Sequence, residues 1–331
     1  MSNKHWRPVA SKDRLFARAD LLKSIRSFFE QRGVLEVETP ILSHAAGTDP
    51  NLESIPATYR ADPQQQEQTL FLQTSPEFAM KRLLASGSGA IFQICKSFRN
   101  SEQGVRHNPE FTLLEWYQPG FDECQLMDEV MALVQFLAQV LNPQALYSQE
   151  KWQRLSYQSL FEQHLGINPH TVSEEDLAKR ALAAFDIELE EASKDTWLDL
   201  LFSHLIEPHL TEPVFIYDYP ATQAALAKID KNSDGIEIGR RFELVISGME
   251  IANGYYELTD EAEQRRRFLC DQEVRRKQRL MSNPLDENLL AAIQSGLPSC
   301  SGVAMGLDRL LMLICDASSI DEVLTFPLDR A

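Results

Sequence analysis

Basic residues are few in this chain: 49 Asp and Glu face 32 Lys and Arg, which gives a formal net charge of −17. A protein that grips a nucleic-acid backbone usually presents a basic face. The acidity therefore makes tRNA a less favoured partner, although a local patch could suffice. One basic cluster exists, interleaved with Asp271 and Glu273, and this pattern is more typical of an exposed helix face than of a docking patch. Its members are Arg265, Arg266, Arg267, Arg275, Arg276, Lys277 and Arg279.

Cysteine is also scarce. The five cysteines, at 95, 124, 270, 300 and 315, are odd in number and lack CxxC spacing, so neither a disulfide framework nor a zinc site is predicted. No apolar run approaches the ~20 residues that cross a bilayer, and the N-terminus lacks the apolar core of a signal peptide. With 331 residues, 44% hydrophobic and 24% charged, the chain is expected to be a globular cytoplasmic enzyme that does not associate with membranes.

Apolar periodicity and chain breakers predict an alternation of helices and strands. Helices are predicted over 13–32, from Glu77 and over 122–141, the first with an apolar face of Leu15, Ala19, Leu22, Ile25 and Phe29. Strands are predicted over 34–42, 91–98, 214–220 and 241–258, the last with a turn near Gly248. Residues 301–316 predict a glycine-containing strand that passes into an apolar helix. Prolines punctuate 142–212, which is expected to be a helical insertion.

The most informative segment is FRNSEQGVRHNPEFTLLEWY, residues 98–117. A strand ends at Arg99, a polar loop follows, and a second strand places Phe111, Leu113, Glu115 and Tyr117 on one side. Burying a carboxylate without a partner is costly, so we expect Glu115 to face a cleft that holds a cation. The forked charge of Arg99 suits phosphate or carboxylate. The segment predicts a site for a ligand with both anionic and cationic groups; an ordinary hairpin is the alternative.

This segment resembles motif 2 of the class II aminoacyl-tRNA synthetases, most closely the lysyl enzymes. Over nearly its whole length the chain resembles their short paralogues, the elongation factor P (R)-β-lysine ligases. The resemblance implies an α+β fold: a class II synthetase-like catalytic domain over 1–331, with a mainly antiparallel sheet flanked by helices and the insertion at about 142–212. The helix over 13–32, the following strand and Pro40 resemble motif 1, which implies a homodimer. Because this helix starts near residue 13, no N-terminal anticodon-binding domain is expected, and tRNA recognition is not expected either.

For the nucleotide, the resemblance implies that Arg99 holds the ATP α-phosphate with the substrate carboxylate and that Phe111 stacks on adenine. GVAMGLDRLLM resembles motif 3, which places Arg309 over the γ-phosphate. The family has Glu two residues after the motif 2 arginine, where this chain has Ser101; either Glu102 reaches ATP through a shifted loop or the contact is weaker. The resemblance gives the catalytic residues as Arg99 and Arg309, and the ATP contacts as Arg99, Asn100, Ser101, Glu102, Asn108, Phe111, Glu243, Leu244, Gly306 and Arg309.

For the metal and the amino acid, the resemblance implies that Glu243 and Glu250 hold Mg²⁺ together with phosphate oxygens, with Glu250 as an alternative substrate contact. Glu77, in TSPE, matches the acid for the α-amino group, although acids are favoured at helix N-termini anyway. Lysyl-tRNA synthetases usually have glycine at Ala304, and this methyl is consistent with a β-amino acid, at ~1–3 kcal/mol of discrimination. The substrate contacts implied are Ser75, Pro76, Glu77, Glu115, Tyr117, Glu250, Asn253, Glu257 and Ala304.

The resemblance therefore implies an ATP- and Mg²⁺-dependent ligase that activates (R)-β-lysine, or lysine, as an adenylate. It would transfer the acyl group to a lysine ε-amine of elongation factor P. Two alternatives stay open: a related ligase with another small acceptor, such as tRNA or ammonia, and a catalytically silent paralogue with a regulatory role. The retained arginines and acids argue against the silent paralogue. Carboxylates matched to a diamine argue against an asparagine-forming ligase.

Overall fold

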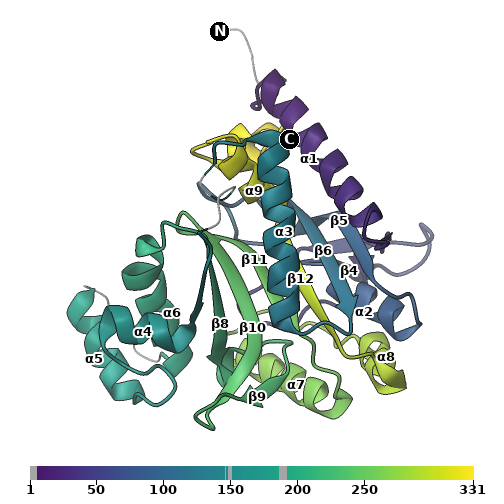
Figure 1. Cartoon of the computed structure of the whole chain (residues 1–331). Helices are drawn as coiled ribbons and strands as arrows, with labels where there is room; N and C mark the ends of the chain where they lie inside the picture. Colours follow the sequence, from purple (N-terminus) through teal and green to yellow (C-terminus); the bar gives the residue numbers. More distant parts are fainter. Residues whose placement is uncertain (1–5, 146, 148–150, 186–191) are drawn as a thin grey trace.

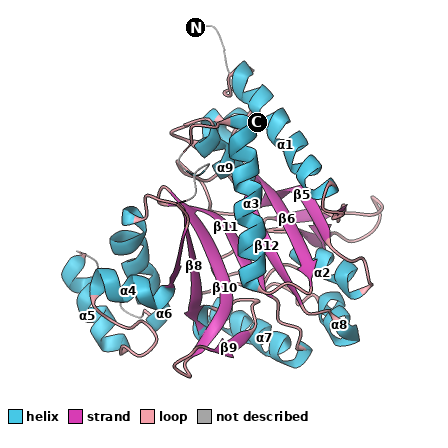
Figure 2. Cartoon of the chain, viewed as in Figure 1, coloured by secondary structure: helices cyan, strands magenta, loops and turns pink. Residues whose placement is uncertain are grey.

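A large sheet forms the centre of the molecule (Figures 1 and 2). The computed structural model describes residues 6–145, 147, 151–185 and 192–331. In spatial order the strands are β1 (Leu35–Glu36), β5 (Ile91–Phe98), β6 (Glu110–Pro119), β12 (Cys300–Gly306), β11 (Met249–Tyr256), β10 (Glu237–Ile246), β8 (Val214–Pro220) and β7 (Gln153–Ser156), and β9 (Ile229–Lys231) pairs with β10. Only the β1–β5 and β7–β8 pairs are parallel among these strands. The predicted mainly antiparallel sheet flanked by helices is confirmed.

Helices cover one face of this sheet. α1 (Lys12–Glu30), α3 (Glu123–Leu141) and α9 (Leu307–Ile314) share one apolar core with the sheet, and Figure 1 shows α3 lying across it. α3 begins with a capping box at Asp122, as favoured at a helix start. By length and composition it is also the one described helix that could cross a membrane, which is weak evidence here because its apolar residues pack into the core.

The alternation along β6 separates core from site, as predicted. Leu114 and Trp116 are fully buried in the helix-covered core, whereas Leu113, Glu115 and Tyr117 line a cavity on the other face. Around that second face lie α2 (Glu77–Ala85), α7 (Glu261–Lys277) and α8 (Glu287–Gly296). The region between 151 and 212 contains α4 (Tyr157–Leu165), α5 (Glu174–Ala184) and α6 (Lys194–Leu201) around their own apolar cluster, together with strand β7.

Asp308 ties the three motif-like segments together. One carboxylate oxygen accepts a hydrogen bond from Arg18 in α1, and the other accepts one from the backbone N–H of Thr112 in β6, at 2.6 Å. Asp308 itself is in the first turn of α9 and is buried. A buried carboxylate with charged and neutral donors is well satisfied, so this residue fixes the motif 3 helix against the motif 2 strand.

Two local predictions were wrong. The strand expected over 34–42 is two short pieces, β1 and β2 (Leu42–Ser43), which belong to different sheets. Pro40 lies between them and has no N–H to donate to a ladder. β2 joins a second, small sheet with β4 (Gln68–Leu72) and β3 (Pro56–Tyr59). In α1, Leu15 and Ala19 are exposed; the buried stripe lies further along the helix, at Leu21, Ile25, Phe28 and Phe29.

Candidate active site

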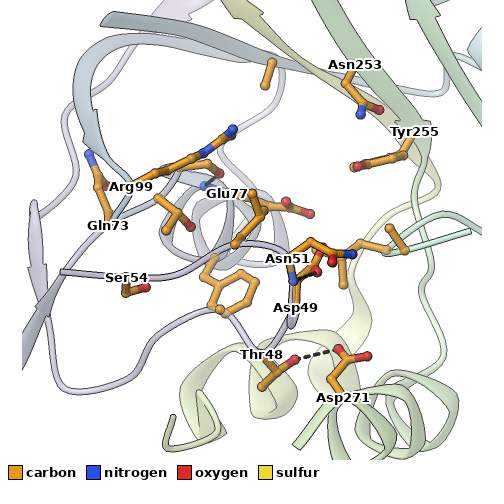
Figure 3. A pocket seen from close by; sticks show the side chains of 18 of the residues that line it. Thr48, Asp49, Asn51, Ser54, Gln73, Glu77, Arg99, Asn253, Tyr255 and Asp271 are labelled. Carbon is orange, nitrogen blue, oxygen red and sulfur yellow. Dashed lines mark hydrogen bonds between the residues drawn. The ribbon is translucent and has the colours of Figure 1, made fainter. Parts of the chain in front are cut away.

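One cavity of about 1930 Å³ opens on the uncovered face of the sheet. Pockets for a single drug-sized ligand usually measure ~300–1,000 Å³, so this cavity has room for two ligands side by side. Its walls come from β6, β10, β11, β12 and α2, together with the β5–β6 loop and residues 42–54 (Figure 3).

The structure brings both predicted arginines to this cavity. Arg99 follows β5, and its guanidinium carbon lies 5.0 Å from the centre of the Phe111 ring. Arg309 extends from the first turn of α9 and donates to the Glu250 backbone oxygen at 2.9 Å; its Nη2 is 2.7 Å from Nε2 of His107. Burial and the Arg309 charge lower the pKa of His107, so this ring is neutral and can accept from the arginine. Two cations beside an aromatic ring form a suitable end for a nucleotide polyphosphate.

The loop residues divide into those that line the cavity and those that do not. Glu102 lines it, with Oε1 3.5 Å from Nη1 of Arg99. Asn100 and Ser101 are outside the lining; Ser101 has a φ of 60° and its hydroxyl donates to Glu53 at 3.4 Å. Glu102, and not Ser101, therefore faces the cavity; that it takes the place of the motif 2 acid stays a prediction.

Two further residues predicted to contact the nucleotide, Leu244 and Asn108, have side chains that already make contacts within the protein. The Leu244 side chain is fully buried in the core, away from the cavity, so only its backbone could meet a nucleotide. The Asn108 amide donates to the Glu110 backbone oxygen at 2.6 Å and accepts from the Leu328 N–H at 3.1 Å. It lines the cavity but also holds the C-terminal segment in place.

Glu243 and Glu250 both line the cavity from paired strands. Glu243 accepts from Arg241 and, at 3.3 Å, from the amide of Asn253, which lies opposite it in the β10–β11 register. Burial raises the pKa of Glu243 to about 7, against the lowering effect of Arg241, and the Glu250 charge raises it further. Among the described residues no cluster of three or more His, Cys, Asp or Glu could hold a metal alone. Two carboxylates fit Mg²⁺ that takes its remaining ligands from phosphate oxygens and water.

The other end of the cavity is acidic. Lys81, which is almost completely buried, lies with Nζ 2.6 Å from carboxylate oxygens of both Glu77 and Glu257. Glu115 is buried beside them; its Oε1 accepts from the Tyr117 hydroxyl at 2.7 Å and its Oε2 has no described protein partner. With all groups ionised, the three carboxylates exceed the single ammonium by two charges. That excess matches a ligand with two ammonium groups.

Burial also changes the protonation of these acids. It raises the pKa of Glu115 to about 8, with Glu77 as the next contribution, and it raises the pKa of Glu257 to about 7 although Lys81 opposes this. A cationic ligand would stabilise the ionised carboxylates and offset the cost of burying them. Without such a ligand this end holds protons near neutral pH.

The remaining predicted substrate residues surround this end. Ser75 accepts from the Glu77 N–H at 3.1 Å, and Pro76 precedes the first residue of α2. Ala304 lies in register between Glu115 on β6 and Asn253 on β11, and its neighbours in β12 include two glycines. At Gly302 an added Cβ would lie 2.2 Å from the Tyr117 ring and 2.6 Å from a Glu257 oxygen. A side chain there would displace both groups.

The sequence analysis did not predict three residues of the candidate site: Lys81, His107 and Arg241. Lys81 follows Glu77 by four residues on a helix, which is the spacing of a favourable ion pair. Arg241 precedes Glu243 by two on a strand, so the two share a face. The sequence therefore contained a signal for both Lys81 and Arg241. His107 lies in an irregular loop, where spacing carries no information about direction.

The basic cluster does not form a free patch. Arg266 and Arg267 both pair with Glu263, Arg265 pairs with Glu261 and Glu287, and Arg276 pairs with Glu273. Arg275 is buried and donates to the backbone oxygens of Asp49 and Met281, both at 2.9 Å.

Comparison with known proteins identifies the family to which the chain belongs. The family model for class II tRNA synthetases (D, K and N) matches residues 4–330. The chain is 48% identical over 335 residues to the elongation factor P–(R)-β-lysine ligase of Pseudoalteromonas translucida, covering 100% of both chains. It is 46% identical to that of Pectobacterium carotovorum, covering 98% of each, and 44% identical to that of Pasteurella multocida, covering 99% of this chain and 98% of the relative. The chain therefore belongs to the class II tRNA synthetase family of the D, K and N type, among the elongation factor P–(R)-β-lysine ligases.

Proposed function

We propose that this ligase activates (R)-β-lysine, or lysine, with ATP and transfers the acyl group to a lysine ε-amine of elongation factor P. The observation that carries this is one cavity with Arg99 and Arg309 at one end and an acidic end with an excess of two negative charges. The names of the relatives supply the acceptor and the β-amino acid.

The first step needs positioning and charge neutralisation more than acid–base chemistry. A carboxylate oxygen of the amino acid attacks the α-phosphorus, and pyrophosphate leaves with the bonding electrons. Arg99 neutralises the carboxylate and the α-phosphate as they approach, and Arg309 holds the terminal phosphate. Glu77, Glu115 and Glu257 hold the two ammonium groups, which fixes the carboxylate in line.

ATP and Mg²⁺ fit the residues present. Phe111 offers a stacking face, Gly306 lets the backbone come close, and Glu243 with Glu250 would hold the metal. Bound Mg²⁺ would neutralise the polyphosphate and orient the pyrophosphate leaving group.

In the second step the acceptor amine nitrogen bonds to the acyl carbon. The bond between that carbon and the phosphate oxygen breaks, AMP leaves with the electron pair, and the protons lost by the ammonium pass to water. The product is an amide. No nucleophilic side chain of the enzyme is required, and the imidazole that lies beside Arg309, that of His107, is hydrogen-bonded to this arginine.

We also propose a cytoplasmic homodimer that does not use tRNA. The five cysteines are free thiols, which is consistent with a reducing compartment such as the cytoplasm. α1 and the short strands after it expose large apolar side chains, with Phe16 59%, Leu35 56% and Leu42 44% exposed, which is a feature of surfaces that bind a partner. Sedimentation velocity should show a dimer that Leu35→Asp shifts towards monomer. A monomeric wild-type protein at micromolar concentration would count against the dimer.

The function is tested by incubating the enzyme with ATP, Mg²⁺, (R)-β-lysine and unmodified elongation factor P, followed by mass analysis of acceptor peptides. We expect one lysyl-type increment on one lysine, absent without ATP. Charging of tRNA with no change in elongation factor P would favour the small-acceptor alternative. Absence of adenylate formation with any amino acid would favour the regulatory paralogue.

A further inference from the structure

Four of the aspartates that line the active-site cavity come from three separate segments. Asp49 belongs to residues 42–54, Asp195 and Asp199 are one turn apart on α6, and Asp271 is on α7. Figure 3 shows Asp49 and Asp271 in the same pocket as Glu77 and Tyr255. We call these four residues the acidic rim. They are not among the residues predicted for ATP or the amino acid.

The rim carboxylates are oriented but not neutralised. Asp195 accepts from the Thr222 hydroxyl at 2.6 Å, Asp199 accepts from the Gln223 amide at 2.7 Å, and Asp271 accepts from a hydroxyl at 2.8 Å. Within the described residues, none of the four rim aspartates forms an ion pair. The nearby arginines of α7 that line the cavity, at 266 and 267, are held by Glu263. The rim therefore keeps its negative charge available to a ligand.

A buried tyrosine points to the same ligand position. The Tyr157 ring on α4 is 1% exposed and stacks on Phe161 and Phe202, with ring centres 4.7 and 5.6 Å away. It lines the cavity, yet its hydroxyl has no hydrogen-bond partner among the described residues. Burial raises the pKa of this hydroxyl, and the nearby Asp199 charge raises it further. A buried hydroxyl without a hydrogen-bond partner is destabilising, so a ligand group that pairs with it at this position would be stabilising.

The charge of the rim selects between acceptor classes. Carboxylates attract an ammonium and repel the phosphates of a nucleic acid. Tyr255 and Glu77 line the same cavity as Asp49, and Figure 3 shows the three in one view. An ammonium held at the rim therefore lies in the same cavity as the two arginines that would hold the adenylate.

We propose that the acidic rim, with Tyr157, binds the side chain of the acceptor lysine as its ammonium and directs it to the adenylate. This rests on the proposed function, since it names the acceptor-binding residues of that reaction. The rim acts in binding; the bonds that form and break are those of the transfer step.

The test uses the full chain with Asp195→Asn and Asp199→Asn combined. Pyrophosphate exchange with (R)-β-lysine should stay within about twofold of wild type, because these residues touch neither ATP nor the amino acid. Transfer to elongation factor P should fall at least tenfold at low acceptor concentration, through a higher KM. The matched control is Glu174→Gln with Glu175→Gln on α5, where both acids lie outside the cavity; its transfer should be unchanged. Tyr157→Phe should raise the acceptor KM severalfold without lowering exchange.

Small nucleophiles separate this inference from the proposed function. In the Asp195/Asp199 variant, cleavage of the enzyme-bound adenylate by N-acetyl-lysine amide, a cation, should slow at least fivefold. Cleavage by hydroxylamine, which is neutral at about pH 7, should not. Equal effects on both nucleophiles, or unchanged transfer to elongation factor P, would overturn the rim proposal. A third outcome is that the wild-type enzyme fails to modify elongation factor P, while the Asp195/Asp199 substitutions still slow cleavage by the cation and not by hydroxylamine. That outcome would overturn the assignment of elongation factor P as acceptor but would support the rim as a site for an ammonium group.

Discussion

The Lys81 ammonium lies 2.6 Å from Oε2 of Glu257, and both side chains are 1% exposed. A second carboxylate, that of Glu77, lies at the same distance from the ammonium. Breaking a buried ion pair by removing one partner is strongly destabilising, because it leaves a charge without compensation in a poorly solvated place. Lys81 therefore acts as a fixed counter-charge between Glu77 and Glu257, and it opposes the rise in the pKa of Glu257 that burial causes.

Lys81→Met should lower the free energy of unfolding by about 3–5 kcal/mol, measured by urea denaturation. Adding Glu257→Gln should restore part of that loss, since the buried charge left without a partner is removed. Lys179→Met is the control; Lys179 pairs with Glu175 at the same spacing but on the surface, where such a pair contributes about 0.3–0.5 kcal/mol. Equal losses in the Lys81 and Lys179 variants would contradict the counter-charge role.

The amino-acid affinity should depend on pH. Because the pKa of Glu115 is raised to about 8 and that of Glu257 to about 7, substrate binding must displace protons below these values. The dissociation constant for the diamino acid should rise as pH falls from 8 to 6, by up to tenfold per unit for each proton displaced. Calorimetry in buffers of different ionisation enthalpy would measure the number of protons released when the diamino acid binds. A Glu115→Gln variant serves as the control, because it has one proton fewer to release. Binding without proton release would exclude the effect.

The same raised pKa values give the sign for stability. Without substrate, the folded state holds protons on Glu115 and Glu257 that the unfolded chain has already lost. The free energy of unfolding should therefore fall as pH rises from about 4.5 through about 8, and a Glu115→Gln variant should lose part of this slope. Thermal unfolding across this range, with and without the variant, measures it. A slope of opposite sign in the difference between the two proteins would contradict it.

Both arginines should be essential for adenylation. Arg99→Ala and Arg309→Ala should each reduce pyrophosphate exchange by at least about 10²-fold, the loss typical when one preorganised electrostatic group is removed. Arg276→Ala removes an equivalent charge from the exposed face of α7, where it pairs with Glu273. That variant should retain wild-type exchange.

Ala304→Gly should relax discrimination towards α-lysine. Ala304 lies between Glu115 and Asn253 in the sheet register, so its methyl group occupies the floor of the amino-acid end. One methyl can supply ~1–3 kcal/mol of discrimination at most, which sets the largest change in the ratio of kcat/KM values at roughly two orders of magnitude. An unchanged ratio for the two lysines would mean that the methyl does not shape the pocket.

The sequence was most informative where structure is regular. Alternation along β6 placed Glu115 and Tyr117 on the cavity side correctly, because strand geometry alone determines it. The turn near Gly248 separates β10 and β11 as predicted, with positive φ at Ser247 and Gly248. These inferences needed only local rules.

The sequence was least informative where long-range contacts decide. Leu244 is predicted to lie beside the nucleotide, but its sequence position could not show that its side chain packs in the core with α3 and α9, which leaves its backbone for that contact. The buried partners of Glu257 could not be read from its own strand, since Lys81 comes from α2, far away in the chain. In α1, Leu15 and Ala19 fit the helical spacing of apolar residues, but both are exposed because the core contacts only the later part of that helix.

The most direct test of the whole account is amino-acid-dependent exchange of pyrophosphate into ATP, compared for (R)-β-lysine, α-lysine and aspartate. A cavity with two arginines at one end and two unmatched negative charges at the other should support exchange with the diamino acids, and best with (R)-β-lysine, but not with aspartate. Exchange with aspartate in preference to either lysine, or with none of the three, would contradict it.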